Sequence, residues 1–197
     1  MRINVLYKGV LVAATLCVAP AALSAAPRAG QPGADTLQSG KRAFAINASN
    51  LLQQVQFDAV SVKDDADQLQ SRLLAPYESD GVADGDLLER VRDRVNEMDK
   101  LLSQLRENQA AASPWQQKAI DRIAPSVVNL TDTTQAAIIS LNDNRGHPYL
   151  SNLPSLARDI SDRASQIVRA TEDFERYASA RHELRQLEQT LGLKGNS

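Results

Sequence analysis

The stretch LLERVRDRVNEMDKLLSQL, from Leu87 to Leu105, places apolar side chains at alternating steps of three and four residues. The series runs Leu88, Val91, Val95, Met98, Leu102 and Leu105. An apolar repeat that averages about 3.5 residues forms one seam along an α-helix and is typical of helices that pack in a bundle or coiled coil. The opposite face carries arginine, aspartate and glutamate side chains, and we expect that face to contact water.

Three other segments repeat this alternation, and each is bounded by residues that start or stop helices. Pro76 stops the first helix, because the residue before a proline avoids the α-helical region. Asp84 is a good N-cap for the second, Ser113 and Pro114 start the third, and Gly192 ends the fourth. We therefore predict helices over 35–75 (or from 41 if Gly40 delays the start), from 84 to about 109, over 113–141, and from 150 or 155 to 191.

Pro125 falls inside the third predicted helix, where a proline removes a backbone hydrogen bond. The apolar series nevertheless continues in phase from Ile123 to Val127 and Leu130. A chain break would reset that phase. We therefore predict a helix that bends at Pro125 and remains continuous.

The connections between these helices are short, which forces consecutive helices to be antiparallel neighbours. The prediction is an all-α, up-down-up-down antiparallel four-helix bundle over residues 35–192, with the first and fourth helices longer than the second and third. The start of the first helix and the end of the fourth are expected to project beyond the other two and to pair with each other. The loops 76–84 and 145–153 are expected to lie at the same end.

The amino-terminal residues have the three parts of a secretory signal peptide. Basic residues precede a short apolar run, Val10 to Val18, and Pro20 follows it ahead of small residues where cleavage after Ser24 or Ala25 is expected. The run is shorter than the roughly 20 residues that span a membrane. We predict a cleavable signal peptide over 1–25, a flexible tail over 26–34, a disordered tail over 193–197, and export to the periplasm or the extracellular space.

The remaining composition argues against most chemistry. The single cysteine, Cys17, lies within the predicted signal peptide, so the mature chain would have no disulfide, thiolate metal site or cysteine nucleophile. The two histidines, His147 and His182, form no Glu-x-x-His motif. Hydrolase and phosphate-loop motifs are absent, and a net charge of −2 does not favour nucleic acid. We predict no enzymatic activity, no cofactor and no metal site.

Three functional hypotheses are compatible with this sequence. The first is an exported, non-enzymatic bundle that binds an unidentified protein or cell-envelope component, with homo-oligomers possible. The second is a bundle that binds a small ligand or cofactor at the end formed by loops 76–84 and 145–153, where Tyr77, His147 and Tyr149 would make contact. The third is a membrane-attached scaffold, which requires the signal peptide to remain uncleaved.

Overall fold

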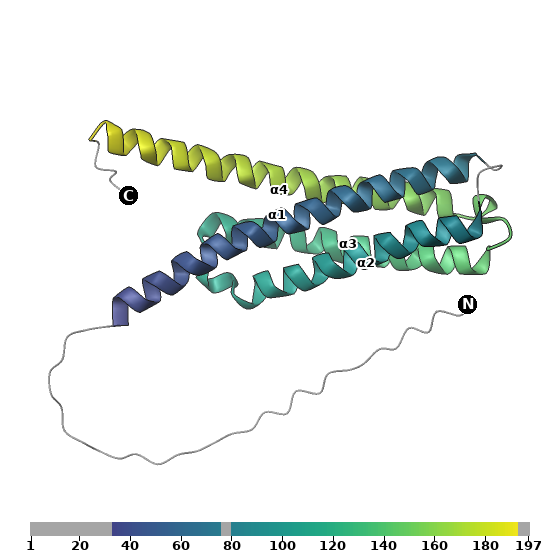
Figure 1. The fold of residues 1–197 in the computed structure, drawn as a ribbon, viewed down its shortest axis with the longest axis horizontal. Coiled ribbons are helices and arrows are strands. Elements are labelled where there is room, and N and C mark those ends of the chain that lie inside the picture. The colour runs from purple at the N-terminus through teal and green to yellow at the C-terminus, as the bar shows by residue number, and fades with distance from the viewer. Residues whose placement is uncertain (1–32, 76–79, 193–197) are drawn as a thin grey trace, which may run out of the picture. The chain divides into compact units, whose positions relative to one another are not determined.

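The computed structural model describes residues 33–75 and 80–192, with side chains from residue 46 onward. This part of the chain is almost entirely helical (Figure 1). Its elements are α1 (Gly33–Leu74), α2 (Gly81–Glu107), the 3-10 helix η1 (Gln109–Ala111), α3 (Pro114–Asp143), the 3-10 helix η2 (Pro148–Leu150) and α4 (Leu153–Thr190). The predicted signal peptide, most of the predicted tail over 26–34, and residues 193–197 lie outside the described residues.

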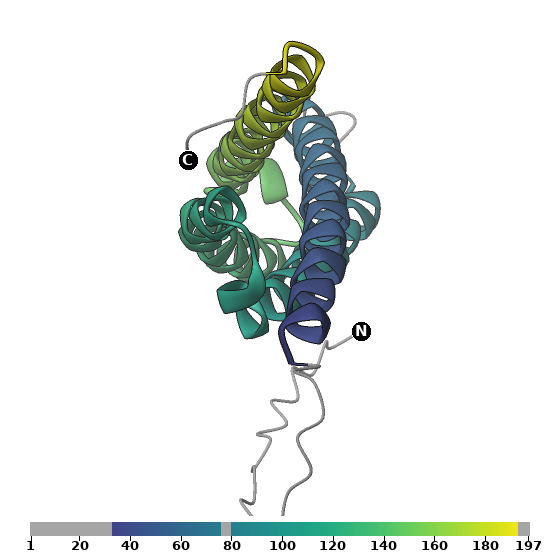
Figure 2. The same cartoon turned by 90° about the vertical axis from the view of Figure 1, so that its left-hand side faces the viewer.

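The four long helices form the predicted antiparallel bundle. α1 packs against α2 and α4, and α3 packs against the same two helices, so α1 and α3 lie diagonally across the bundle (Figures 1 and 2). α1 has 42 residues and α4 has 38, whereas α2 has 27 and α3 has 30. At about 1.5 Å per residue, the two longer helices extend well beyond the other pair. Both the architecture and the length order are confirmed.

The seam predicted from α2 is buried along its full length. Each member is at most 2 % exposed: Leu88, Val91, Val95, Met98, Leu102 and Leu105. Burying a side chain of this size stabilises a fold by about 1.5–3 kcal/mol. α4 contributes smaller side chains to the same core, with Ala157 and Ala164 between Ile160 and Ile167. The alternation of large and small residues lets the facing helices approach closely.

Continuity of α3 through Pro125 is confirmed, because one unbroken helix runs from Pro114 to Asp143. Its start has the predicted chemistry. The backbone N–H of Ser113 donates to Oε1 of Gln116 at 2.9 Å, which forms part of a capping box, and Pro114 occupies the first turn. The fourth helix also ends as predicted, with Gly192 at a φ of 65°.

The start of α2 differs from the prediction. Asp80, not Asp84, is the N-cap: its side chain accepts a hydrogen bond from the backbone N–H of Val82 at 3.1 Å. Asp84 lies one turn further along, is 0 % exposed, and accepts a 2.8 Å bond from Nε of Arg72 on α1. The prediction was wrong because an aspartate one turn inside a helix looks like an N-cap in sequence when glycines flank it.

Two further cross-helix ion pairs join α1 to α2. Asp58 pairs with Arg94 and Asp65 with Arg90, each at 2.9 Å. Together with the Arg72–Asp84 pair, they form a series along the α1–α2 boundary. A shift of one helix by a single turn would separate all these charges, so the series favours one register.

The two connections at the far end of the bundle meet closely. A Cβ atom built on Gly81 would lie 2.7 Å from the carbonyl oxygen of Arg145. Only glycine allows the two backbones to approach in this way. The prediction that the loops around 80 and 145 share one end of the bundle is therefore confirmed.

The expected pairing of the projecting helix ends is wrong. The first turns of α1 and the last turns of α4 diverge, and this is visible in both ribbon views (Figures 1 and 2). In α4, Leu184, Leu187 and Leu191 are 56 %, 59 % and 68 % exposed. The seam that holds α4 in the bundle ends near Thr171, because the residues that follow along it are smaller or charged.

The buried ion pair provides a test of the α1–α2 boundary. Arg72→Ala leaves the carboxylate of Asp84 buried without its guanidinium partner, and we expect the free energy of unfolding to fall by about 3 kcal/mol. The matched control is Arg176→Ala, which removes an exposed pair with Glu172 at 3.4 Å and should cost no more than about 0.5 kcal/mol. Urea unfolding of both variants measures the difference. Equal losses would contradict the assignment.

A second polar link joins α1 to α4. Asp67 accepts hydrogen bonds from Lys63 at 2.6 Å and from the hydroxyl of Ser161 on α4 at 2.5 Å. Burial alone would raise the pKa of Asp67, but the hydrogen bonds from Lys63 and Ser161 and the charge of Lys63 outweigh it, so the pKa is lowered. The same hydrogen bond and the charge of Asp67 raise the pKa of Lys63.

This link predicts a dependence of stability on pH. A carboxyl whose folded pKa is lowered stabilises the fold above its unfolded pKa of about 3.9 and loses that contribution as the pH falls through the folded pKa. We expect Asp67→Asn to reduce the loss of stability in acid relative to the wild type. Denaturant unfolding between about pH 2 and 6 measures this, with Asp162→Asn as an exposed control. An unchanged acid profile in Asp67→Asn would contradict it.

Candidate functional site

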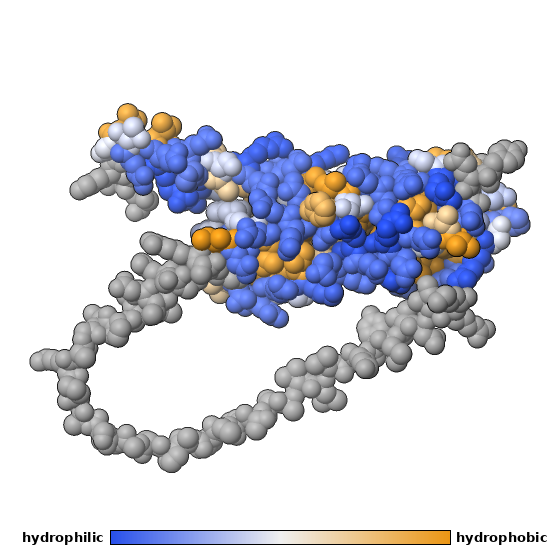
Figure 3. Space-filling model, viewed as in Figure 1, coloured by the Kyte–Doolittle hydropathy of each residue, from blue (hydrophilic) through white to orange (hydrophobic). Residues whose placement is uncertain are grey.

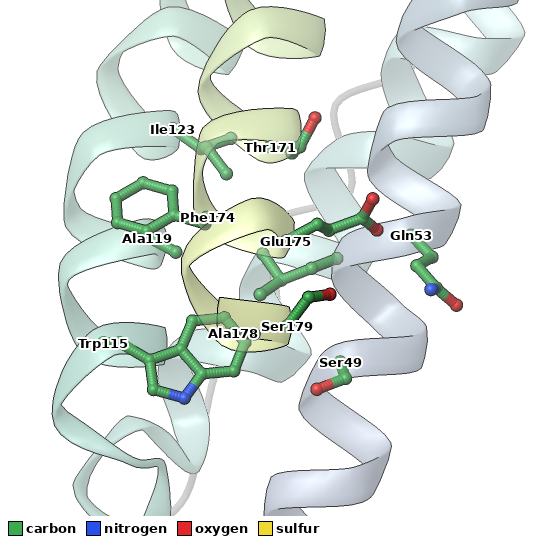
Figure 4. Close-up of a pocket in the computed structure, with 11 residues that line it drawn as sticks. Ser49, Gln53, Trp115, Ala119, Ile123, Thr171, Phe174, Glu175, Ala178 and Ser179 are labelled. Carbon is green, nitrogen blue, oxygen red and sulfur yellow. The ribbon is translucent and has the colours of Figure 1, made fainter. Parts of the chain in front are cut away.

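The bundle has two adjoining cavities at the end where α3 begins and where α1 and α4 diverge. We call this the open end. The inner cavity, of about 220 Å³, lies between α1, α3 and α4 (Figure 4). Its walls include the rings of Trp115 and Phe174 on one side and the polar side chains of Ser49 and Gln53 on the other.

The inner cavity exists because small residues occur where the core elsewhere has leucine or isoleucine. Ala119 of α3 and Ala178 and Ser179 of α4 line it. Thr171, at the upper edge in Figure 4, is buried and donates its hydroxyl hydrogen bond to the carbonyl of Ile167 at 3.0 Å. Above that point the α1–α4 interface is filled, whereas below it no large apolar side chain closes the gap.

The outer cavity, of about 330 Å³, lies on the other side of the same two rings, between α3 and α4. Trp115 and Phe174 line both cavities, so they form a partition between them. The charged residues of the outer cavity are Lys118, Arg122, Arg181 and Asp173, three cations against one anion. We call the two cavities together the open-end groove.

The position of Trp115 is set by its neighbour Gln116, which is 1 % exposed. Oε1 of Gln116 accepts from the backbone N–H of Ser113, and Nε2 donates to the hydroxyl of Ser49 on α1 at 3.1 Å. One side chain therefore caps α3 and ties it to α1. The indole of Trp115 is held at the edge of the groove as a result.

The residues predicted from the sequence lie at the opposite end. His147 and Tyr149 are neighbours there, with ring centroids 5.9 Å apart in an edge-to-face arrangement and 3.4 Å between the tyrosine hydroxyl and Nδ1. His147 is exposed and Tyr149 is half-buried. Tyr77 lies outside the described residues. Neither open-end cavity includes His147 or Tyr149, and their role in binding stays a prediction.

The sequence does contain signals for the open-end groove. Trp115 is the only tryptophan and lies off the apolar seam, and we expected it to shield one end of the bundle. The run Ala178-Ser179-Ala180 follows two aromatic residues, Phe174 and Tyr177, within one helix. Large rings beside small residues indicate a hollow. That α1 supplies the opposite wall depends on tertiary structure and has no local signal.

Within residues 33–75 and 80–192, no group of three histidine, cysteine or acidic side chains is placed to hold a metal ion. The helices of this part also lack a stretch both long and apolar enough to cross a membrane. No protein-family model, curated protein or solved structure matches the chain. The open-end groove combines aromatic rings, small apolar residues and a cationic rim, which are groups that recognise a partner.

Proposed function

We propose that this protein is an exported, non-enzymatic binding protein that receives an amphipathic segment of a partner protein in its open-end groove. The observation that carries the proposal is the pair of cavities divided by Trp115 and Phe174. Aromatic side chains with partly exposed faces are the residues on which binding energy concentrates in protein interfaces. Burying one large apolar side chain against them supplies about 1.5–3 kcal/mol.

The charge of the groove favours an acidic partner. Lys118 and Arg122 are exposed, lie one turn apart on α3, and face the outer cavity together with Arg181 of α4. Cations around an apolar groove attract a segment whose polar face carries glutamate or aspartate, and they accelerate its association. Such binding weakens as the salt concentration rises, because exposed charges are screened beyond about 10 Å at 0.1 M salt.

The proposal keeps the first of the three hypotheses and moves its contact surface. The alternative, a small ligand or cofactor held near Tyr77, His147 and Tyr149, lacks a described cavity as support. Membrane attachment follows only if the signal peptide is retained. The case against catalysis rests on the motifs that the sequence lacks, and the case for binding rests on the groove.

The groove predicts selective peptide binding that Trp115 reports directly, since it is the chain's only tryptophan. We expect an amphipathic helical peptide with leucine and phenylalanine on one face and glutamate on the other to shift the Trp115 emission to shorter wavelength saturably. A version with lysine in place of glutamate should bind far more weakly. In Lys118→Glu/Arg122→Glu the preference should reverse. Fluorescence titration at low and high salt measures both effects.

The matched control is Lys100→Glu/Arg158→Glu, which makes the same change in net charge on exposed parts of α2 and α4. It should retain the preference for the glutamate peptide. If neither peptide alters the Trp115 emission, or if both double variants respond alike, the groove is not the binding surface.

The export component predicts a shortened mature chain. Expression in a host with a secretory pathway should yield a protein that lacks the first 24 or 25 residues, because small residues precede the expected cleavage points after Ser24 and Ala25. Mass spectrometry of the purified protein measures this. A mature protein that still begins at Met1 would contradict cleavage and would favour the membrane-attached alternative.

A further inference from the structure

The end of α4 carries a second apolar seam that the bundle does not cover. Its members follow alternating steps of three and four residues: Tyr177, Ala180, Leu184, Leu187 and Leu191. All five are exposed, and the three leucines are 56–68 % exposed. Figure 3 shows apolar side chains gathered at this tip, at the upper left. We call residues 177–191 the α4 tip.

The α4 tip cannot return to its own bundle by continuing the helix. The seam that packs in the bundle runs through Ile167, Thr171, Phe174 and Ala178. Its next positions are Arg181, Arg185 and Glu188, which are charged. The apolar seam of the tip begins at Tyr177, one residue out of register with the first. The tip therefore presents its leucines in a direction different from the bundle core.

Two heptads of exposed leucine form half of a helix pair, and the flanking charges indicate the other half. With Tyr177, Leu184 and Leu191 at position a and Ala180 and Leu187 at position d, the e positions are Arg181 and Glu188. The g positions are Arg176, Glu183 and Thr190. Position e and position g lie on opposite flanks of the seam.

A parallel pair of α4 tips is disfavoured by these charges. In that arrangement each g position faces the e position five residues later in the partner. Arg176 would face Arg181, and Glu183 would face Glu188. Both contacts join like charges.

An antiparallel pair has the opposite outcome. Reversal of one helix brings each flank against the same flank of the partner, and Leu184 then packs opposite Leu187 of the second copy. Arg181 faces Glu188 across one flank, and the two-fold symmetry makes this contact twice. On the other flank Glu183 faces the uncharged Thr190. Neither Arg181 nor Glu188 has an ion-pair partner within the described part of its own chain.

We propose that the α4 tip is a self-association surface, through which two copies of this chain pair in an antiparallel coiled coil. Ala180 lies opposite Leu191 in this register, so a small side chain receives a large one. The overlap covers two heptads, or about 21 Å of helix at 1.5 Å per residue. Because stable coiled coils usually need three or four heptads, we expect the dimer to dissociate on dilution.

The test is sedimentation equilibrium of the purified protein over a series of concentrations. The wild type should convert from monomer to dimer as the concentration rises. R181E places glutamate against glutamate in both flank contacts, and E188R places arginine against arginine, so each variant alone should remain monomeric. An equimolar mixture of R181E with E188R restores both opposite-charge contacts and should form a heterodimer. The double variant R181E/E188R should dimerise like the wild type.

Each result decides the proposal. A wild type that stays monomeric at every concentration overturns it, and so does a variant pair that fails to recover dimers on mixing. A stronger dimer in R181E overturns the antiparallel orientation, because that substitution would create attractive contacts with Arg176 in a parallel pair. L187E, which should abolish the dimer, separates this surface from the groove, since Leu187 lines neither cavity. Circular dichroism checks that the exposed substitutions leave the bundle folded.

Discussion

Removal of the α2 seam from water is the interaction on which the remaining structure depends. Six side chains from Leu88 to Leu105 are almost fully buried, and they can be buried only if α1, α3 and α4 surround them or support the helices that do. Once that seam is enclosed, the short connections permit only antiparallel neighbours. The polar contacts then select among arrangements: the Arg72–Asp84 pair fixes one end of the α1–α2 boundary, and Gln116 fixes the relation of α3 to α1 at the other.

Periodicity predicted the architecture well, because burial of one face of a helix leaves a direct imprint on residue spacing. Its failures have a common physical origin. The spacing of Asp84 does not reveal that Arg72, twelve residues earlier, would reach it across a helix boundary. The leucines of the α4 tip continue an apolar repeat, yet a one-residue change of phase turns them away from the core. Both outcomes depend on neighbours that are distant along the chain.

The candidate site was less predictable than the fold for the same reason. Trp115 was expected to shield the end of the bundle, and its ring does lie there, but the adjoining space depends on Ala119, Ala178 and Ser179 coming together from two helices. Sequence spacing identifies what fills a core and gives little indication of what is left unfilled. His147 and Tyr149 attracted interest through their scarcity, which is a property of composition and carries no information about shape.

Pro125 has a mechanical consequence for the groove. A proline has no amide hydrogen, so the carbonyl of Asp121, four residues earlier, lacks its partner in the helix ladder. The segment of α3 that carries Trp115 is therefore joined to the rest of the helix by a weaker connection than an uninterrupted helix provides. Bending stiffness is lowest between the groove and the tightly packed middle of the bundle. The wall formed by Trp115 can tilt about this point at small energetic cost, and the width of the groove can adjust without disturbing the core.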